Sequence, residues 1–163
     1  MFDLDHFKSI NDRFGHDTGD WVLKQVADAC RTVCRRIDHI GRIGGEEFAI
    51  LLSRCDLRDA TRAAEDCRMR VASIDTRSSG HKFLVTASFG VTASPLSGYD
   101  LAKLLSHADK MLYRAKREGR NRVCTFGGEA QQWTQLQPVL VAVPAFQEAP
   151  EGASRGASRQ PMS

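Results

Sequence analysis

Apolar residues recur along this chain at two characteristic spacings, and these spacings predict where its helices and strands lie. Intervals of three and four residues predict a long helix capped by Thr18 or Asp20, and two further helices within 60–74 and 101–115. Strict alternation of apolar and polar residues predicts a strand over 83–92. The apolar face predicted for the first long helix is Val22, Val26, Ala29, Val33 and Ile37.

Shorter segments complete the predicted order of elements. A continuous apolar run over 48–52 is typical of a central strand covered on both faces. The remaining segments are the end of a strand at 1–5, a short helix at 6–14, a turn at 15–19, a loop at 95–98 and an edge strand at 122–126. The resulting order, β-α-α-β-β-α-β-α-β, predicts an α+β fold with a mostly antiparallel central sheet flanked by helices.

The composition changes near residue 127. Residues 1–126 carry the periodic segments and form one predicted domain, whereas residues 127–163 are rich in Gln, Pro, Ala, Gly and Ser. Such a composition cannot bury enough apolar surface to offset chain entropy, so we expect this tail to be mostly disordered. Within it, Leu136–Phe146 is apolar enough to dock on the domain.

Charge and cysteine content narrow the classes of function. The chain has 163 residues, 42% of them hydrophobic, and no apolar run long enough to span a membrane. Its five cysteines form no C-x-x-C pair, which favours reduced thiols and a cytoplasmic location. A basic cluster over 110–122 lacks interleaved aromatic residues, so it favours a nucleotide polyphosphate over nucleic acid.

The segment Gly44-Gly45-Glu46-Glu47 lies between two apolar runs and predicts a tight hairpin with two acids at its tip. Adjacent carboxylates repel each other, and a bound divalent cation relieves that repulsion. Taken alone, these residues are equally typical of an ordinary glycine turn with solvated acids.

Several short motifs are spread over residues 1–126: Asp3-x-Asp5-x-Phe7-Lys8-x-Ile10-Asn11-Asp12, Phe14-Gly15-His16, Gly19-Asp20, Gly44-Gly45-Glu46-Glu47-Phe48, Ala108-Asp109, Tyr113-x-Ala115-Lys116 and Gly119-Arg120-Asn121. Together they resemble the GGDEF domain of diguanylate cyclases. That family has a fold similar to the palm of polymerases and of nucleotide cyclases, and it condenses two GTP into cyclic di-GMP across a domain dimer. The alternatives are a non-catalytic module that binds GTP or cyclic di-GMP, and an inactive fragment of a cyclase.

The resemblance implies a metal and catalytic centre. Asp3, the carbonyl of Leu4 and Glu46 would ligate Mg²⁺ or Mn²⁺, and Glu47 would bind metal or help to activate the attacking 3′-hydroxyl. Lys116 would neutralise charge on the triphosphate. Asp5 should point away from Asp3, because side chains alternate along a strand, and we expect it to have a structural role such as capping the next helix.

The resemblance also implies a GTP site. Asn11 and Asp20 would bind guanine, although both residue types also favour helix caps. The remaining GTP-binding residues implied are the backbone N–H groups of Phe7 and Lys8, the Lys8, Lys116 and Arg120 side chains, and Gly45, which lets the nucleotide approach the hairpin.

Arg35-x-x-Asp38 matches the family's product-inhibition site for cyclic di-GMP. A surface ion pair worth less than about 1 kcal/mol is the alternative. Some relatives add an arginine from the following helix, where this chain has Asp66, so we expect weaker inhibition.

Family members usually carry a helical segment and most of the first strand before the residue that corresponds to Met1. We therefore expect a domain that lacks its N-terminal helices and the start of its first strand, with an upstream sensor or dimerising region elsewhere. Such a chain alone is expected to be weakly active or inactive.

Overall fold

The computed structural model describes residues 1–127. The predicted order of long helices and strands is confirmed, with a 3₁₀ helix and a one-turn helix added. The elements are β1 (Phe2–Leu4), α1 (Phe7–Phe14), α2 (His16–Arg31), β2 (His39–Gly44), β3 (Glu47–Leu51), α3 (Leu57–Ala72), the 3₁₀ helix η1 (Thr76–Ser79), β4 (Ala87–Val91), α4 (Ser94–Ser97), α5 (Leu101–Arg117) and β5 (Val123–Thr125).

A five-stranded sheet in the order β2-β3-β1-β4-β5 forms the centre of the domain. All neighbouring pairs are antiparallel except β4 and β5, which are parallel. The predicted α+β class is therefore confirmed. The central strand is β1 rather than β3, which lies one place out, beside the edge strand β2. Accordingly Ile50 and Leu51 are only half-buried, whereas all three residues of β1 are buried.

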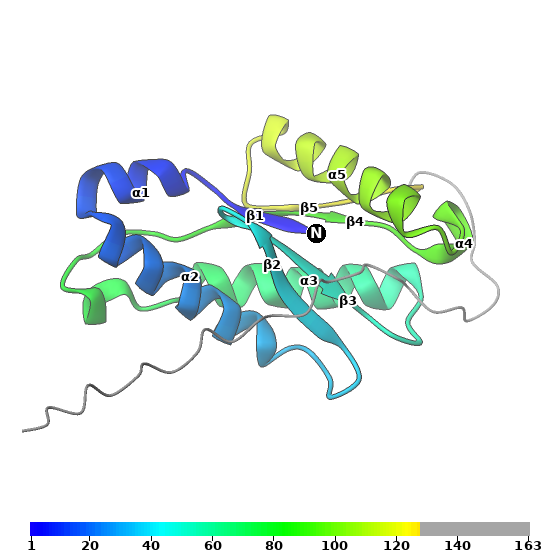
Figure 1. Cartoon of the computed structure of the whole chain (residues 1–163), viewed down its shortest axis with the longest axis horizontal. Coiled ribbons are helices and arrows are strands. Elements are labelled where there is room, and N and C mark those ends of the chain that lie inside the picture. Colours follow the sequence, from blue (N-terminus) through cyan, green and yellow to red (C-terminus); the bar gives the residue numbers. More distant parts are fainter. Residues whose placement is uncertain (128–163) are drawn as a thin grey trace, which may run out of the picture.

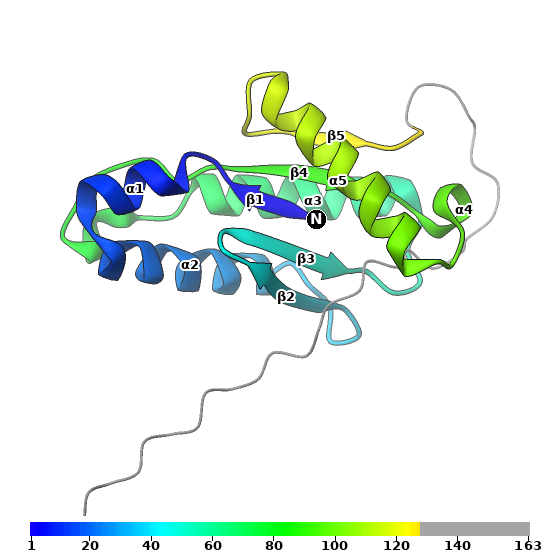
Figure 2. The ribbon, with the colours of Figure 1, turned by 45° about the horizontal axis from the view of Figure 1, so that its top comes forward.

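Helices cover the sheet from both sides (Figures 1 and 2). Helix α5 lies on one side, against β4 and β5, and α2 and α3 lie together on the other. The contact between α5 and β4 is close because Gly90 has no side chain. A Cβ atom at Gly90 would lie 2.0 Å from the backbone oxygen of Ala108 and 2.4 Å from the backbone nitrogen of Leu112.

Three phenylalanine rings connect the middle strands of the sheet. Phe2 of β1 stacks on Phe48 of β3 with ring centroids 5.1 Å apart, and on Phe89 of β4 at 4.7 Å. All three rings are almost completely buried. Aromatic pairs of this kind add about 0.5–1.5 kcal/mol to the stabilisation from burial.

Helix α2 differs from its prediction at both ends. It begins at His16, directly after Gly15, so the predicted turn over 15–19 is wrong. The Thr18 hydroxyl, which was expected as a cap, donates instead to the Phe14 carbonyl at 2.9 Å. The helix ends at Arg31, which leaves Ile37 outside it and exposed. The buried face contains Leu23 and Cys30 as well as Val22 and Val26.

The fourth strand is shorter than predicted. Its hydrogen-bonded part begins at Ala87 rather than Phe83. Phe83 bonds instead to the hydroxyl of Thr76, which accepts from the Phe83 N–H at 3.0 Å and donates to the Phe83 carbonyl at 2.9 Å. The loop predicted at 95–98 contains the helical turn α4, which has Pro95 in its first turn.

Two sequence predictions remain predictions. The tail over 128–163, including the docking segment, lies outside the described residues, and so does any structure before Met1. Among residues 1–127, no helix combines the length and the apolar character that crossing a membrane requires.

Candidate active site

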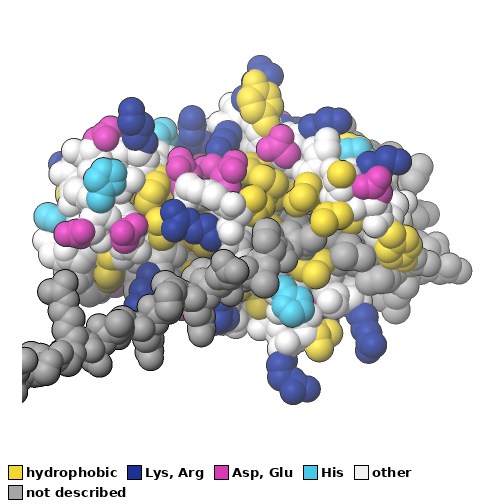
Figure 3. Space-filling model, in the orientation of Figure 1, with side chains coloured by type: hydrophobic (Ala, Val, Ile, Leu, Met, Phe, Trp, Pro, Cys, Tyr) yellow, Lys and Arg dark blue, Asp and Glu magenta, His cyan; other side chains and the backbone are white. Residues whose placement is uncertain are grey.

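The predicted acids meet where the β2–β3 hairpin passes the end of β1. Asp3 pairs directly with Glu47 across the two antiparallel strands, and the Leu4 N–H donates to the Glu46 carbonyl at 3.3 Å. Directly opposed residues have Cβ atoms about 5 Å apart, so the carboxylates of this pair are neighbours. Figure 3 shows acidic side chains gathered in this region, next to lysine or arginine side chains.

The hairpin tip has the tight turn that its glycines predict. Gly45 has φ +51°, a left-handed conformation that glycine adopts without steric cost. The Arg42 guanidinium Nε donates to the Gly45 carbonyl at 2.7 Å and braces the turn. Glu46 follows in the turn and Glu47 begins β3, and both are half-buried. The turn thereby presents two acids beside β1.

Lys116 links α5 to this acidic group. Its Nζ lies 2.8 Å from Asp3 Oδ2. Burial raises the pKa of Asp3, Lys116 opposes that rise, and the charges of Glu46 and Glu47 add to it. The net direction is upward, and burial is its largest cause. By formal charge, three carboxylates face one Lys116 ammonium here. The structure thus brings together Asp3, Glu46, Glu47 and Lys116 as predicted.

The donor chemistry of this group fits a hard divalent cation. Carboxylate and backbone carbonyl oxygens are the ligands that Mg²⁺ prefers, and excess negative charge favours a cation. Within the described chain, no three His, Cys, Asp or Glu side chains already form a group that could hold a metal ion. One Asp3 oxygen is paired with the Lys116 ammonium. A metal ion bound through Asp3 Oδ2 would compete with Lys116 for that oxygen.

Asn11 of α1 packs closely against Gly19 of α2. Asn11 Oδ1 is buried and has no hydrogen-bond partner among the described residues. A Cβ atom at Gly19 would lie 1.8 Å from this oxygen, so only glycine leaves room for the amide. A buried acceptor without a donor is costly, which suits a site that a ligand N–H completes.

Neither Asn11 nor Asp20 caps a helix. The residue before α1 is His6 and the residue before α2 is Gly15, and neither helix start has a side-chain cap. Asp20 is an exposed residue of α2 that lines a cleft of about 510 Å³. Pockets of about 300–1,000 Å³ are typical for small ligands.

This cleft lies between α2 and the β2–β3 hairpin. Its wall includes Asp20 and Phe48, the residue next to Glu47, and it also carries Lys24, Arg31 and Arg42. Sequence reasoning did not select Lys24 or Arg31, because a charged residue on an amphipathic helix normally indicates only a solvated face. Lys24 and Arg31 are recognised as cleft residues only once the packing of α2 beside the β2–β3 hairpin is known.

The predicted phosphate ligands surround the same end of the sheet. Phe7 and Lys8 begin α1, where the first backbone N–H groups of a helix have no intrahelical acceptor. Lys8 and Arg120 are exposed, and Arg120 lies in the loop between α5 and β5 with φ +60°. Backbone N–H groups and free cations suit a polyphosphate, although these residues do not contact one another.

Arg35 and Asp38 form a hydrogen-bonded clip rather than a simple surface pair. Asp38 accepts from the Arg35 backbone N–H and Nε at 2.9 Å each, and from the Ser53 N–H at 3.0 Å. The Asp38 side chain is 1% exposed, and that of Arg35 is 51% exposed. Burial alone would raise the pKa of Asp38, but these hydrogen bonds outweigh it and the net pKa is lowered. The clip ties the α2–β2 loop to the end of β3.

Replacing Asp38 by Ala is expected to destabilise the domain by about 2 kcal/mol, because the Ser53 N–H and the Arg35 donors lose a charged acceptor. A carboxylate with a lowered pKa stabilises the fold above its unfolded pKa of about 3.9, and that contribution disappears as pH falls through the lower folded pKa. Urea unfolding at pH 7 and near pH 3 measures both effects. Glu65→Ala, which removes an ion pair with Arg68 within α3, is the control. Equal losses at both pH values would contradict the expectation.

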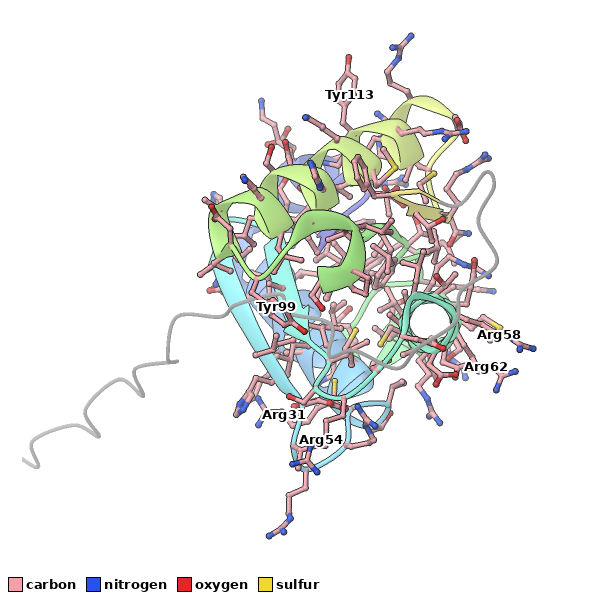
Figure 4. The ribbon with its side chains drawn as sticks, turned by 90° about the vertical axis from the view of Figure 1, so that its right-hand side faces the viewer. Arg31, Arg54, Arg58, Arg62, Tyr99 and Tyr113 are labelled. Carbon is pink, nitrogen blue, oxygen red and sulfur yellow. The ribbon has the colours of Figure 1, made fainter. Side chains whose placement is uncertain are left out.

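A cavity of about 230 Å³ adjoins the clip and is lined partly by α3. Its charged wall contains Arg35, Asp38, Asp59, Arg62 and Asp66. Figure 4 shows Arg58 and Arg62 projecting outward from α3, and Arg31 and Arg54 at the lower end of the domain. Asp66 therefore contributes negative charge where the family resemblance leads us to expect an arginine.

The sequence matches the family described as "Diguanylate cyclase, GGDEF domain" over residues 1–122. It is 40% identical over 126 residues to the diguanylate cyclase VdcA of Vibrio cholerae, an alignment that covers 76% of this chain and 37% of the relative. The chain spans between 18% and 37% of the length of the curated relatives it matches.

Solved structures show the same relationship. The GGDEF domain of DgcB from Caulobacter crescentus, in complex with c-di-GMP, superposes with a TM-score of 0.69 at 36% identity, covering 76% of this chain and 74% of that one. The active GGEEF domain of a diguanylate cyclase from Vibrio cholerae gives a TM-score of 0.70 at 38% identity, covering 76% and 78%.

Proposed function

This chain belongs to the diguanylate cyclase GGDEF family, and from that premise we propose that it condenses two GTP molecules into cyclic di-GMP and two pyrophosphates. The observation that carries the proposal is the pairing of Asp3 with Glu47 across β1 and β3, beside Lys116. Acids beside a cation are the groups that phosphoryl transfer requires, and Asp20 lines a cleft of nucleotide size whose wall does not include these residues.

In the proposed reaction, the 3′-hydroxyl oxygen of each GTP forms a bond to the α-phosphorus of the other. The bond between that phosphorus and the oxygen bridging to the β-phosphate breaks, pyrophosphate leaves, and the hydroxyl proton is lost. Glu47 would accept or relay this proton. Lys116 would move from Asp3 toward the triphosphate and neutralise its charge.

The family is divalent-metal dependent, and Mg²⁺ or Mn²⁺ is the ion we propose here. Asp3, the Leu4 carbonyl, Glu46 and Glu47 would hold it. When bound, it supplies positive charge that polarises the phosphates and stabilises the charge of the transition state.

GTP recognition is proposed for Asn11 and for the cleft between α2 and the hairpin. The unpaired Asn11 Oδ1 would accept from a guanine N–H, and Asp20 would accept from the guanine N1–H and N2–H₂ groups. The backbone N–H groups of Phe7 and Lys8, with the Lys8 and Arg120 side chains, would bind phosphate oxygens. Gly45 would leave room for the nucleotide beside the hairpin.

One domain offers one GTP site, whereas the reaction joins two GTP molecules. The proposed catalytic unit is therefore a homodimer whose two sites face each other. Product inhibition is proposed at Arg35 and Asp38, where Asp38 holds the guanidinium and the exposed part of Arg35 remains available to guanine or phosphate. Asp66 in the same cavity is expected to weaken the binding of an anionic product.

The direct test incubates concentrated purified chain with GTP and Mg²⁺ or Mn²⁺ and detects cyclic di-GMP by chromatography. Formation of cyclic di-GMP supports the proposal and the ability of two domains to pair. Binding of GTP or cyclic di-GMP without turnover, also under conditions of enforced dimerisation, would contradict it and favour a binding module.

Replacing Gly19 by Ala is expected to weaken GTP binding about tenfold, because the new methyl group must displace the Asn11 amide. Titration with α,β-methylene GTP, which lacks the bridging oxygen cleaved in the reaction, measures affinity without turnover. Ala29→Gly, a change on the same helix but outside the cleft, controls for altered helix stability. Unchanged affinity in Gly19→Ala would exclude Asn11 from guanine recognition.

A further inference from the structure

Asp5 is a buried acid that the proposed chemistry leaves unused. Its side chain does not cap α1, contrary to the expectation from sequence. Asp5 Oδ1 accepts from the Ser88 hydroxyl at 2.7 Å, and Oδ2 accepts from the Thr86 hydroxyl at 2.8 Å and from the Asn121 backbone N–H at 3.0 Å. The carboxylate therefore joins the end of β1 to the segment entering β4 and to the α5–β5 loop.

The loop that Asp5 holds has an unusual backbone. Gly119, Arg120 and Asn121 have consecutive positive φ values of 115°, 60° and 44°. Arg120 and Asn121 carry side chains, for which this region costs about 1 kcal/mol or more per residue, so surrounding contacts must maintain it. The Asn121 N–H to Asp5 joins this backbone to the end of β1, and the Arg122 carbonyl, which accepts from the Phe89 N–H at 2.9 Å, joins the loop to β4.

Three other contacts hold the loop at its edges. The Arg120 N–H donates to the Ala115 carbonyl at 3.0 Å, and Arg68 NH1 of α3 donates to Asn121 Oδ1 at 3.0 Å. Arg122 Nε donates to the Arg120 carbonyl at 3.2 Å. These bonds use the backbone of Arg120 and leave its guanidinium exposed. The backbone of Arg120 is therefore held in place, whereas its guanidinium group extends into solvent.

We propose that Asp5 is a positioning residue that holds the α5–β5 loop so that Arg120 faces the GTP triphosphate. The inference rests on the proposed function, because it takes GTP as the ligand of Arg120. The expectation from sequence that Asp5 points away from Asp3 is wrong, because side chains two residues apart in an extended chain share a face, and the hydroxyl of Ser88, the residue paired with Asp3, donates to Asp5. Asp3 pairs with Lys116 on α5, and Asp5 places Arg120 just beyond the end of α5. The two acids thereby act on α5 and on the loop that follows it.

The charge of Asp5 is not what the role requires. In Asp5→Asn, the amide oxygen can take the place of Oδ2 and accept from Thr86 and Asn121, while the amide nitrogen donates to the Ser88 hydroxyl. Asp5→Ala removes every acceptor. The two variants therefore separate the hydrogen bonds from the negative charge.

The test is a double-mutant cycle on the binding of α,β-methylene GTP in the presence of Mg²⁺. Asp5→Ala is expected to weaken binding about tenfold in the wild-type background and less than about twofold in an Arg120→Ala background, because its effect passes through Arg120. Asp5→Asn should bind within about threefold of wild type. Ser88→Ala, which removes one Asp5 hydrogen bond without touching the loop, is the matched control and should bind normally. If Asp5→Ala does not fold, Asp5→Glu, whose carboxylate is displaced along a longer side chain, takes its place.

Amide hydrogen exchange at Asn121 provides a readout that does not depend on GTP. The exchange is expected to be slow in wild type and Asp5→Asn and at least about tenfold faster in Asp5→Ala. Equal losses of affinity in both backgrounds, or unchanged exchange, would overturn the inference. Failure of wild type to bind the analogue, with the exchange difference present, would instead overturn the proposed function and the choice of GTP as ligand.

Discussion

Cyclic di-GMP synthesis is expected to fall by at least about 10³-fold when Glu46 and Glu47 are both replaced by glutamine. Glutamine keeps the size of each side chain and an oxygen acceptor but removes two negative charges beside Asp3, so the proposed cation is held far more weakly. The half-buried positions in the hairpin tolerate a neutral amide, and the fold should persist. Chromatographic product detection with excess GTP and Mg²⁺ measures the loss.

The matched control for this double variant is Arg35→Ala. Arg35 lies near the opposite end of β3 from the acids. The Arg35→Ala variant should therefore keep its initial rate of synthesis while binding added cyclic di-GMP more weakly. The glutamine variant should show the reverse pattern, with no synthesis and normal product binding. If the glutamine variant loses both properties, the two sites are not separate. If it keeps its activity, the acids are not the metal ligands.

Replacing Gly90 by Ala is expected to destabilise the domain by about 3 kcal/mol. The new methyl group would meet the backbone of Ala108 and Leu112 at 2.0 and 2.4 Å, and backbone cannot move aside as a flexible side chain can. Against a total stability of about 5–15 kcal/mol for a domain, this is a large fraction. Urea unfolding followed by circular dichroism measures the change.

Gly44→Ala is the control for this substitution. A Cβ atom there would meet nothing within 4 Å, and Gly44 does not have a positive φ. The free energy of unfolding of the Gly44→Ala variant should stay within about 0.5 kcal/mol of the wild-type value. Similar unfolding midpoints for the two variants would show that α5 can shift away from β4 at little cost.

Periodicity predicted the order of the elements because each long helix and strand has an apolar face that must be buried. It failed where the chain has competing local partners. Thr18 is of a residue type that often caps helices, yet its hydroxyl donates to the carbonyl of Phe14, the last residue of α1. Ile37 continues the apolar spacing of α2, but the helix has already ended at Arg31. Element boundaries depend on such contacts, which spacing alone does not encode.

The acids and cations of the site could be chosen from motifs, because their residue types and gaps are specific. How these residues are arranged in space could not be predicted from the motifs. The pairing of Asp3 with Glu47 depends on strand register, and the ion pair with Lys116 depends on how α5 packs on the sheet. The bonds of Asp5 to Thr86, Ser88 and Asn121 join parts of the chain that are more than eighty residues from it. No local pattern predicts such contacts.

The stack of Phe48, Phe2 and Phe89 bears on how such a sequence can change over time. Phe2 precedes Asp3 and Phe48 follows Glu47, so along each strand a ring and an acid project to opposite faces. The rings maintain the strand pairing whatever residue occupies the acidic positions. Substitutions at the acids can therefore accumulate without unfolding the domain. A lineage that loses synthesis this way would still have an intact scaffold, on which selection could retain nucleotide binding alone.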